Sequence, residues 1–419
     1  MNALLLLGAV ALLLILRQPL LVILLAAIGF AQMVWGGGHL TWIAEDMFVS
    51  LDKELILAIP MFMLCGGVMT KGSTARRLTD VARTLTGHLP GGLGVAAVLS
   101  SAVFAAISGS SIVTMIAIGG VIYPSMREAG YSNRFALGTV MSGGTLGIII
   151  PPSIPLILYG LVTESSIVDL FRAGVGPGLL LVGLFAAYAV IANRNMATTR
   201  FSASAFLHAL RRGIWALMMP VILLGGIYSG FFSPTEAAAV ALVYAVFVEL
   251  FIHRELRLAD LKTVVMEAAK LGGALFPLIA VALSLNLILI ENRVPDHMLG
   301  LVSGWIDSPL TFIIVVNLLL LAVGAFMTTA EAILILGPLL APLAVSYGFD
   351  KIVFGIIMIV NLEIGLLTPP VGLNLIVGMS TFRQPFGILA RAAVPFILLM
   401  IFALAMISWQ PAISLFFVH

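Results

Sequence analysis

Charged residues are scarce in this sequence, and their scarcity excludes a soluble protein. Of the 419 residues, 10% are Asp, Glu, Lys or Arg, against about 25% in an ordinary soluble domain. Hydrophobic residues make up 61% and extend over the whole length, so no polar stretch is long enough to form a soluble domain. The net charge of +2, with basic residues dispersed, excludes the basic footprint that nucleic-acid binding needs. The composition predicts an all-α polytopic membrane protein.

Sequence signatures of catalysis are missing as well. The single cysteine, Cys65, allows neither a disulfide framework nor a cysteine metal site. The sequence has no His-Glu-x-x-His zinc motif, no Gly-x-Ser-x-Gly elbow and no Gly-x-x-x-x-Gly-Lys-Ser/Thr phosphate loop. We therefore expect a protein that is not an enzyme and that uses an ion gradient rather than ATP. An intramembrane hydrolase is a distant alternative, because no histidine is predicted at the depth of Ser108-Gly109-Ser110-Ser111 to act as a base.

Long apolar runs are abundant and predict ten crossings of a hydrocarbon core of about 30 Å. Two further runs, 91–125 and 308–345, are interrupted by small polar residues at 108–111 and 327–329, which predicts two re-entrant hairpins. Membranes tolerate such breaks only where protein or a water-filled cavity surrounds them, so we expect both to point inward. The predicted crossings are residues 3–16, 19–35, 55–70, 135–163, 174–192, 214–231, 235–252, 271–290, 352–380 and 392–410.

Basic residues gather in alternate connections, and the positive-inside rule places these in the cytoplasm. On this topology 17 Lys and Arg lie inside and four outside, with both termini outside. The first run has no basic residue before it, so we expect a retained span rather than a cleaved signal peptide. Segments 73–86 and 256–269 mix apolar and charged residues at helical spacing, which is typical of helices along the inner interface or of solvated linkers.

The chain repeats itself at an offset of 218 residues. The first hairpin is expected to enter from the cytoplasm and the second from outside, so the halves are related by inversion, which is typical of secondary transporters. The predicted organisation is 1–54 N-terminal scaffold helices, 55–192 repeat 1, 193–270 central scaffold helices with a cytoplasmic interfacial segment, and 271–419 repeat 2. The offset superposes Gly119 on Gly337, Pro124 on Pro342, Gly130 on Gly348, Gly147 on Gly365, Pro151-Pro152 on Pro369-Pro370, Gly160 on Gly378 and Pro177 on Pro395.

Paired prolines interrupt a second helix in each repeat, at Pro151-Pro152 and Pro369-Pro370. They remove N–H donors and leave carbonyls of the preceding turn free, and nearby glycines let the chain unwind. Such carbonyls, with hydroxyls from a hairpin tip, form a cage of hard ligands for a small cation such as Na⁺; a kink satisfied by neighbouring helices is the alternative. The intramembrane acids Glu331 and Glu363 are candidate functional residues or structural carboxylates.

Short motifs with a characteristic order and spacing extend over nearly the whole chain. They are Pro60-Met61-Phe62, Lys71-Gly72, Ala75-Arg76-Arg77-Leu78, Gly87-His88-Leu89-Pro90-Gly91-Gly92, Ser108-Gly109-Ser110-Ser111, Gly144-Thr145-Leu146-Gly147, Pro151-Pro152-Ser153 and Asn361 through Asn374. Together they resemble the large membrane subunit of tripartite ATP-independent periplasmic (TRAP) transporters. The resemblance implies an elevator-type transporter of the bacterial inner membrane that imports an organic acid with Na⁺ as the coupling ion. It implies two partners, a small four-helix membrane subunit and a soluble periplasmic binding protein.

The resemblance also implies site residues at matching positions. A first sodium site would use Ser108, Ser111, Gly147, Ile150 and Pro152. A second sodium site would use Gly324, Gly365, Thr368 and Val371. The substrate would contact Ser110, Thr328, Asn361 and Glu331. Relatives commonly carry an acid at the position of Thr328, whereas here the acid is Glu331. A single-chain Na⁺/dicarboxylate symporter without a binding protein is the main alternative, and a channel is a weaker one.

Overall fold

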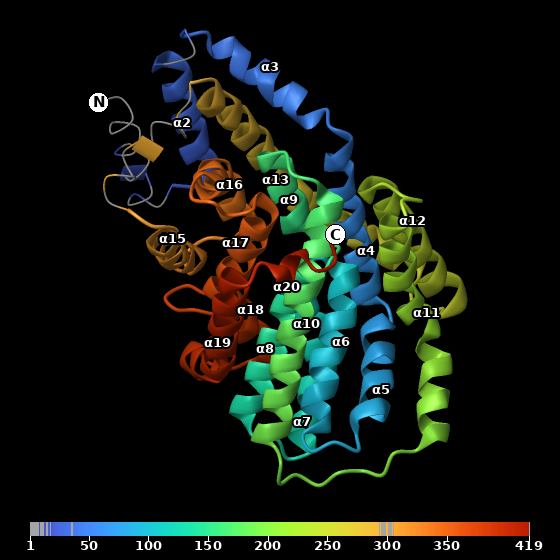
Figure 1. The fold of residues 1–419 in the computed structure, drawn as a ribbon. Helices are drawn as coiled ribbons and strands as arrows, with labels where there is room; N and C mark the ends of the chain where they lie inside the picture. Colours follow the sequence, from blue (N-terminus) through green and yellow to red (C-terminus); the bar gives the residue numbers. More distant parts are fainter. Residues whose placement is uncertain are drawn as a thin grey trace.

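The computed structural model describes residues 8, 12–13, 16, 18–34, 37–292, 294, 299–300, 304 and 306–418, which form helices and connections without a strand (Figure 1). Eight of its helices are long and apolar enough to cross a membrane. The predicted all-α polytopic fold is therefore confirmed. Of the predicted crossing 3–16, only residues 8, 12, 13 and 16 are among the described residues.

The helices follow the apolar runs, and short turns with Gly, Pro or a capping Ser separate them. Their bounds are α2 Leu20–Val34, α3 Leu40–Leu51, η1 Glu54–Leu57, α4 Ala58–Lys71, α5 Thr74–Thr86, α6 Gly92–Ser108, α7 Ser111–Glu128, α8 Asn133–Ile149, α9 Ile154–Thr163, α10 Ile167–Ala192, α11 Ala203–Tyr228, α12 Pro234–Phe247, η2 Val248–Ile252, α13 Leu258–Glu291, α15 Pro309–Gly324, α16 Thr329–Ser346, α17 Lys351–Leu366, α18 Leu373–Phe382, α19 Phe386–Trp409 and α20 Ala412–Leu415.

Two regions differ from the sequence prediction. Segment 256–269, expected as a separate interfacial segment, is continuous with the following crossing in the 34-residue helix α13. It continues because an apolar side faces the bundle: Val264 is buried and packs on Gly67 of α4, where a Cβ would come within 2.8 Å of its Cγ1. The other difference is the additional helix α3, which lies between the predicted crossings 19–35 and 55–70.

The predicted inverted repeat is present in the helices. Helices α6 to α10 have counterparts in α15 to α19 at nearly the same offset, so that α7 corresponds to α16 and α8 to α17. The hydroxyl of Tyr159, in the middle of α9, donates to the carbonyl of Lys351, 2.7 Å away, where α17 begins. Helix α9 follows the C-terminal end of α8, so α17 starts on the side of the protein where α8 ends. The two counterparts α8 and α17 therefore run in opposite directions.

Connections predicted to share a side of the membrane lie together. Thr199, after α10, donates to the Gly87 carbonyl at 3.0 Å, and Arg134, near the start of α8, donates to the Arg391 carbonyl in α19 at 3.0 Å. At the other end, Thr235 donates to the Glu54 carbonyl at 3.3 Å. Figure 1 shows α5 to α8 and α10 gathered in the lower half of the view, with the connection from α10 to α11 crossing below them. Assignment of that end to the cytoplasm remains a prediction from its basic residues.

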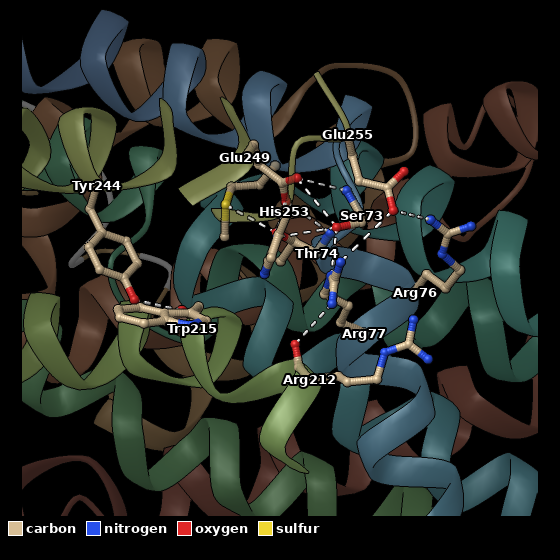
Figure 2. Close-up of polar contacts among 11 residues, drawn as sticks. Ser73, Thr74, Arg76, Arg77, Arg212, Trp215, Tyr244, Glu249, His253 and Glu255 are labelled. Carbon is tan, nitrogen blue, oxygen red and sulfur yellow. Dashed lines mark hydrogen bonds and ion pairs between the residues drawn. The ribbon is translucent and has the colours of Figure 1, made fainter. Parts of the chain in front are cut away.

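A buried carboxylate positions α5. Glu249 in the π-helical turn η2 is fully buried and accepts hydrogen bonds from the backbone N–H groups of Ser73 and Thr74, each at 3.1 Å (Figure 2). A Cβ at Gly72 would overlap this carboxylate. A negative group at the start of a helix satisfies its free N–H donors and the helix dipole, so Glu249 fixes where α5 begins.

Candidate functional site

The first hairpin turns at 108–111 in the interior of the protein. Helix α6 ends at Ser108, Gly109 adopts left-handed backbone at φ 58°, and Ser110 caps α7 by accepting from the Val113 N–H at 3.5 Å. The hydroxyls of Ser108 and Thr114 are 2.7 Å apart. Glycine suits position 109 both for its positive φ and for its neighbours, because a Cβ there would come within 3.2 Å of the Pro152 carbonyl oxygen.

The first broken helix meets this hairpin tip. Helix α8 ends at Ile149, and α9 starts at Ile154, capped by the Ser153 hydroxyl, which accepts from the Leu156 N–H at 3.4 Å. Gly147 lies directly against the tip: a Cβ there would overlap the Ser110 carbonyl oxygen and come within 2.6 Å of the Thr114 hydroxyl. The structure thus joins the tip that carries Ser108 and Ser111 to the break that carries Gly147 and Pro152.

Ile150, the remaining member of the predicted first sodium site, directly follows α8. Its backbone is extended, at φ −79° and ψ 127°, so the helix has ended at this residue. Its side chain packs toward Gly178 of α10, where a Cβ would come within 2.7 Å of Ile150 Cγ1. Ile150 therefore lies in the break itself, with its side chain directed at the neighbouring helix.

The second half repeats this junction. Gly324 is the last residue of α15, and its backbone packs against that of Gly365 near the end of α17. A Cβ on Gly324 would come within 3.0 Å of the Leu362 carbonyl oxygen and 3.2 Å of Gly365 Cα. The Gly372 N–H donates to the Ala325 carbonyl at 3.1 Å. Thr368 donates its hydroxyl to the Ile364 carbonyl at 2.7 Å, and Val371 follows in the same break, half-buried. Tip and break again touch.

The predicted substrate residues lie on three elements, and among the described residues no hydrogen bond joins them across those elements. Ser110 lies half-buried on the first tip, whereas Thr328 and Glu331 lie at the start of α16. Those two form a capping box, in which the Thr328 N–H donates to Glu331 at 2.9 Å and the Glu331 N–H donates to the Thr328 hydroxyl at 3.3 Å. The Glu331 carboxylate thus satisfies its own helix end. Asn361 is buried in α17 and donates to the Asn317 side chain.

Polar side chains from the two halves meet behind the tips. The Asn374 amide of the second half donates to the Ser111 hydroxyl of the first at 2.6 Å. Within the second half, the Thr329 hydroxyl donates to the Glu363 carboxylate at 2.9 Å. Among the described residues, one oxygen of each of Asn361, Glu363 and Asn374 is buried without a hydrogen-bond partner. A buried polar atom left unpaired costs about 1–3 kcal/mol, and each of these oxygens has the capacity to accept a hydrogen bond from a ligand or a water molecule.

Sequence reasoning missed Thr114 and Asn374 as members of this region. Thr114 lies three residues beyond Ser111 on α7, so helical spacing to a candidate ligand was its only local signal. Asn374 falls inside the motif that starts at Asn361, but its partner Ser111 is 263 residues away. That pairing depends on how the two halves pack, which periodicity does not encode.

Comparison with known proteins identifies the family. Residues 7–413 match the family model described as "Tripartite ATP-independent periplasmic transporter, DctM component". The chain belongs to this family. It is 44% identical over 376 residues to the C4-dicarboxylate TRAP transporter large permease protein DctM of Pseudomonas aeruginosa, covering 89% of this chain and 88% of that one. The resemblance predicted from the motifs is confirmed.

Two other matches concern the family and the fold of this TRAP large subunit. It is 38% identical over 393 residues to the isethionate TRAP transporter permease protein DctMQ of Oleidesulfovibrio alaskensis, covering 91% of this chain and 61% of that one. Its fold matches the crystal structure of the Alcanivorax borkumensis YdaH transporter with a TM-score of 0.65 at 15% identity, covering 90% and 89%. The chain is therefore a multi-pass membrane subunit of a TRAP transporter, and the two sequence relatives are named permease proteins.

Proposed function

We propose that this TRAP large subunit imports an organic acid across the bacterial inner membrane by Na⁺-coupled elevator alternating access. The observation that carries the proposal is the pair of junctions between hairpin tip and broken helix, one in each inverted half. Inverted repeats place substrate and coupling-ion sites where discontinuous helices of the two halves meet near the midplane. Each junction combines backbone carbonyls at a helix break with hydroxyl groups, and of these carbonyls that of Gly365 also accepts from the Thr368 N–H at 2.9 Å.

Sodium fits the donor chemistry of both junctions. The first offers the hydroxyls of Ser108 and Ser111 with carbonyls of Gly147, Ile150 and Pro152. The second offers Thr368 with carbonyls of Gly324, Gly365 and Val371. Neutral oxygens are hard ligands, which suit alkali cations better than soft transition metals. Within the described ranges, no three or more His, Cys, Asp or Glu side chains gather as a metal site, which agrees with this ion class.

An elevator movement is supported by a division between inner and outer helices. Nearly all residues of the broken helices α8 and α17 are buried, whereas α11 and α13 present large apolar side chains such as Trp215, Val221 and Leu271 to the outside. Apolar side chains on an outer face suit lipid or a partner helix. We infer that the outer helices form the scaffold, with the small membrane subunit against them, and that the inner core carries the substrate.

Substrate delivery by a periplasmic binding protein completes the proposal, as in the tripartite arrangement that gives the family its name. The test is uptake of labelled organic acids into proteoliposomes that hold the chain with its small membrane subunit. Uptake that needs both an inward Na⁺ gradient and the binding protein is the expected result. Na⁺-dependent uptake without the binding protein would instead support the single-chain symporter, and fluxes at channel rates would overturn the carrier mechanism.

A further inference from the structure

A basic cavity lies between α5 and α11, apart from both junctions. Its volume is about 720 Å³. The acidic residues of its lining are Asp80 and Glu255, and the basic ones are Arg76, Arg77, Arg83, His208 and Arg212. An adjoining cavity of about 510 Å³ shares Arg83, Thr84 and Ala205 with it and adds Arg200 and Glu128. The proposed transport mechanism uses none of these residues.

The acidic residues leave part of this positive charge uncompensated. Glu255 pairs with Arg76 at 3.0 Å and lies 3.9 Å from Arg77. Of the residues that the structure describes, none forms an ion pair within 4.0 Å with Arg83 or Arg212. Four guanidinium groups against two carboxylates leave a formal charge of +2, counted from the lining. Arg212 on α11 and Arg83 on α5 are thus available to a ligand from opposite walls.

Arg77 lies close enough to Arg212 and Arg76 for their charges to repel one another. Arg77 donates to the Arg212 carbonyl at 3.1 Å, and Figure 2 shows the guanidinium groups of Arg76 and Arg212 extending to the same side of the view. Burial lowers the pKa of Arg77, Glu249 opposes this shift, and the charge of Arg212 lowers the pKa again. A phosphate held between these groups would relieve the repulsion, and Arg binds phosphate with paired, charge-assisted hydrogen bonds.

The surroundings of the cavity favour a membrane lipid over a soluble anion. Helix α5 buries an apolar side at Leu78 and Val81, and α11 continues from the cavity into a candidate membrane span. On α11, His208, Arg212 and Trp215 follow at i, i+4 and i+7, so they share one side of the helix. Trp215 is 42% exposed, and tryptophan is enriched where a bilayer meets water. Acyl chains of a lipid bound here would lie along the apolar surface of α11.

We propose that this cavity binds the phosphate of an anionic phospholipid headgroup between Arg83 of α5 and Arg212 of α11. Basic pockets between helices on the cytoplasmic side of a membrane suit such headgroups. A phosphate held from both walls fastens α5, which connects directly to the first hairpin helix, to the outer helix α11. The lipid therefore stabilises the arrangement of α5 on the scaffold.

The test measures thermal unfolding of the purified full-length chain with short-chain phosphatidylglycerol. The expected result is a saturable rise in the unfolding midpoint that short-chain phosphatidylcholine does not give. Arg83→Gln with Arg212→Gln should need at least about tenfold more phosphatidylglycerol for the same rise, which corresponds to about 1.4 kcal/mol. The matched control, Lys262→Gln with Lys270→Gln, removes two exposed charges of α13 and should respond like wild type.

A second variant keeps the test decisive if the double arginine variant does not fold. Ala205 lies three residues after the cap Ser202 of α11, so Ala205→Glu creates a capping box that favours the helix while adding a negative charge to both cavities. It should abolish the phosphatidylglycerol response. A wild-type rise in the unfolding midpoint with phosphatidylglycerol in this variant would overturn the site. An equal loss of that rise in the lysine control would show that general surface charge causes the effect. An equal rise of the wild-type midpoint with inorganic phosphate would overturn the lipid as the ligand.

Discussion

Substitution of Gly365 by alanine tests the second junction most sharply. A Cβ at this position would come within 2.5 Å of Gly324 Cα and 2.8 Å of the Ala325 nitrogen. Both are backbone atoms, so no side chain can rotate away. An ordinary contact of about 3.5 Å requires the end of α15 and the break of α17 to separate by about 1 Å.

The size of the effect follows from this overlap. Overpacking in a well-packed interior costs about 1–3 kcal/mol. We expect Na⁺ to bind only when the end of α15 and the break of α17 are in contact. Binding must then supply this energy, and the Na⁺ concentration for half-maximal uptake should rise about 5- to 150-fold. The matched control is Gly183→Ala on α10, where a Cβ meets nothing within 4 Å and alanine should favour the helix by about 0.5–1 kcal/mol.

The assay is the Na⁺ dependence of substrate uptake in proteoliposomes that contain equal amounts of each variant. Gly147→Ala, at the equivalent position of the first junction, should behave like Gly365→Ala, because its Cβ would overlap the Ser110 carbonyl oxygen. Normal membrane insertion with weakened Na⁺ dependence in both variants, and neither change in Gly183→Ala, is the expected pattern. A wild-type Na⁺ dependence in both junction variants would refute the sodium assignment.

Three further predictions concern topology, capping and the contact between halves. Arg76→Cys should resist a membrane-impermeant maleimide added from the periplasmic side, whereas Phe231→Cys, at an 82% exposed position beyond α11, should be labelled; the reverse pattern would invert the topology. Glu331→Gln should retain uptake, because glutamine also completes a capping box, whereas Glu331→Ala should lower the unfolding midpoint by the equivalent of about 0.5–2 kcal/mol; loss of uptake with glutamine would show that the charge itself is needed. Asn374→Ala leaves the buried Ser111 hydroxyl without this donor and should destabilise the fold by about 1–3 kcal/mol in thermal unfolding; an unchanged midpoint would remove this contact from the account.

Local sequence signals predicted the parts of the fold that depend on local chemistry. Small polar residues interrupt the hairpins, paired prolines end α8 and α17, and matching Gly and Pro positions reveal the repeat. Each signal acts through the backbone of its own segment, by removing an N–H donor or by permitting a positive φ. These features could therefore be located before any contact between segments was known.

Contacts between distant segments could not be predicted in the same way. Glu249 caps α5 from 175 residues away, and Asn374 meets Ser111 only because the two halves pack together. The continuity of α13 depends on Val264 packing against Gly67, which outweighs the polar composition of its first turns. In each case packing between distant segments determines the contact, whereas helical periodicity describes each segment by itself.

The most direct test of the central claim is equilibrium binding of Na⁺ to the purified chain and to its two junction variants. Two ions bound to wild type, with one weakened in Gly147→Ala and the other in Gly365→Ala, is the result that the account predicts. K⁺ in place of Na⁺ should give no binding at the same concentration. Na⁺ binding that is absent from wild type, or unchanged in both variants, would contradict the account.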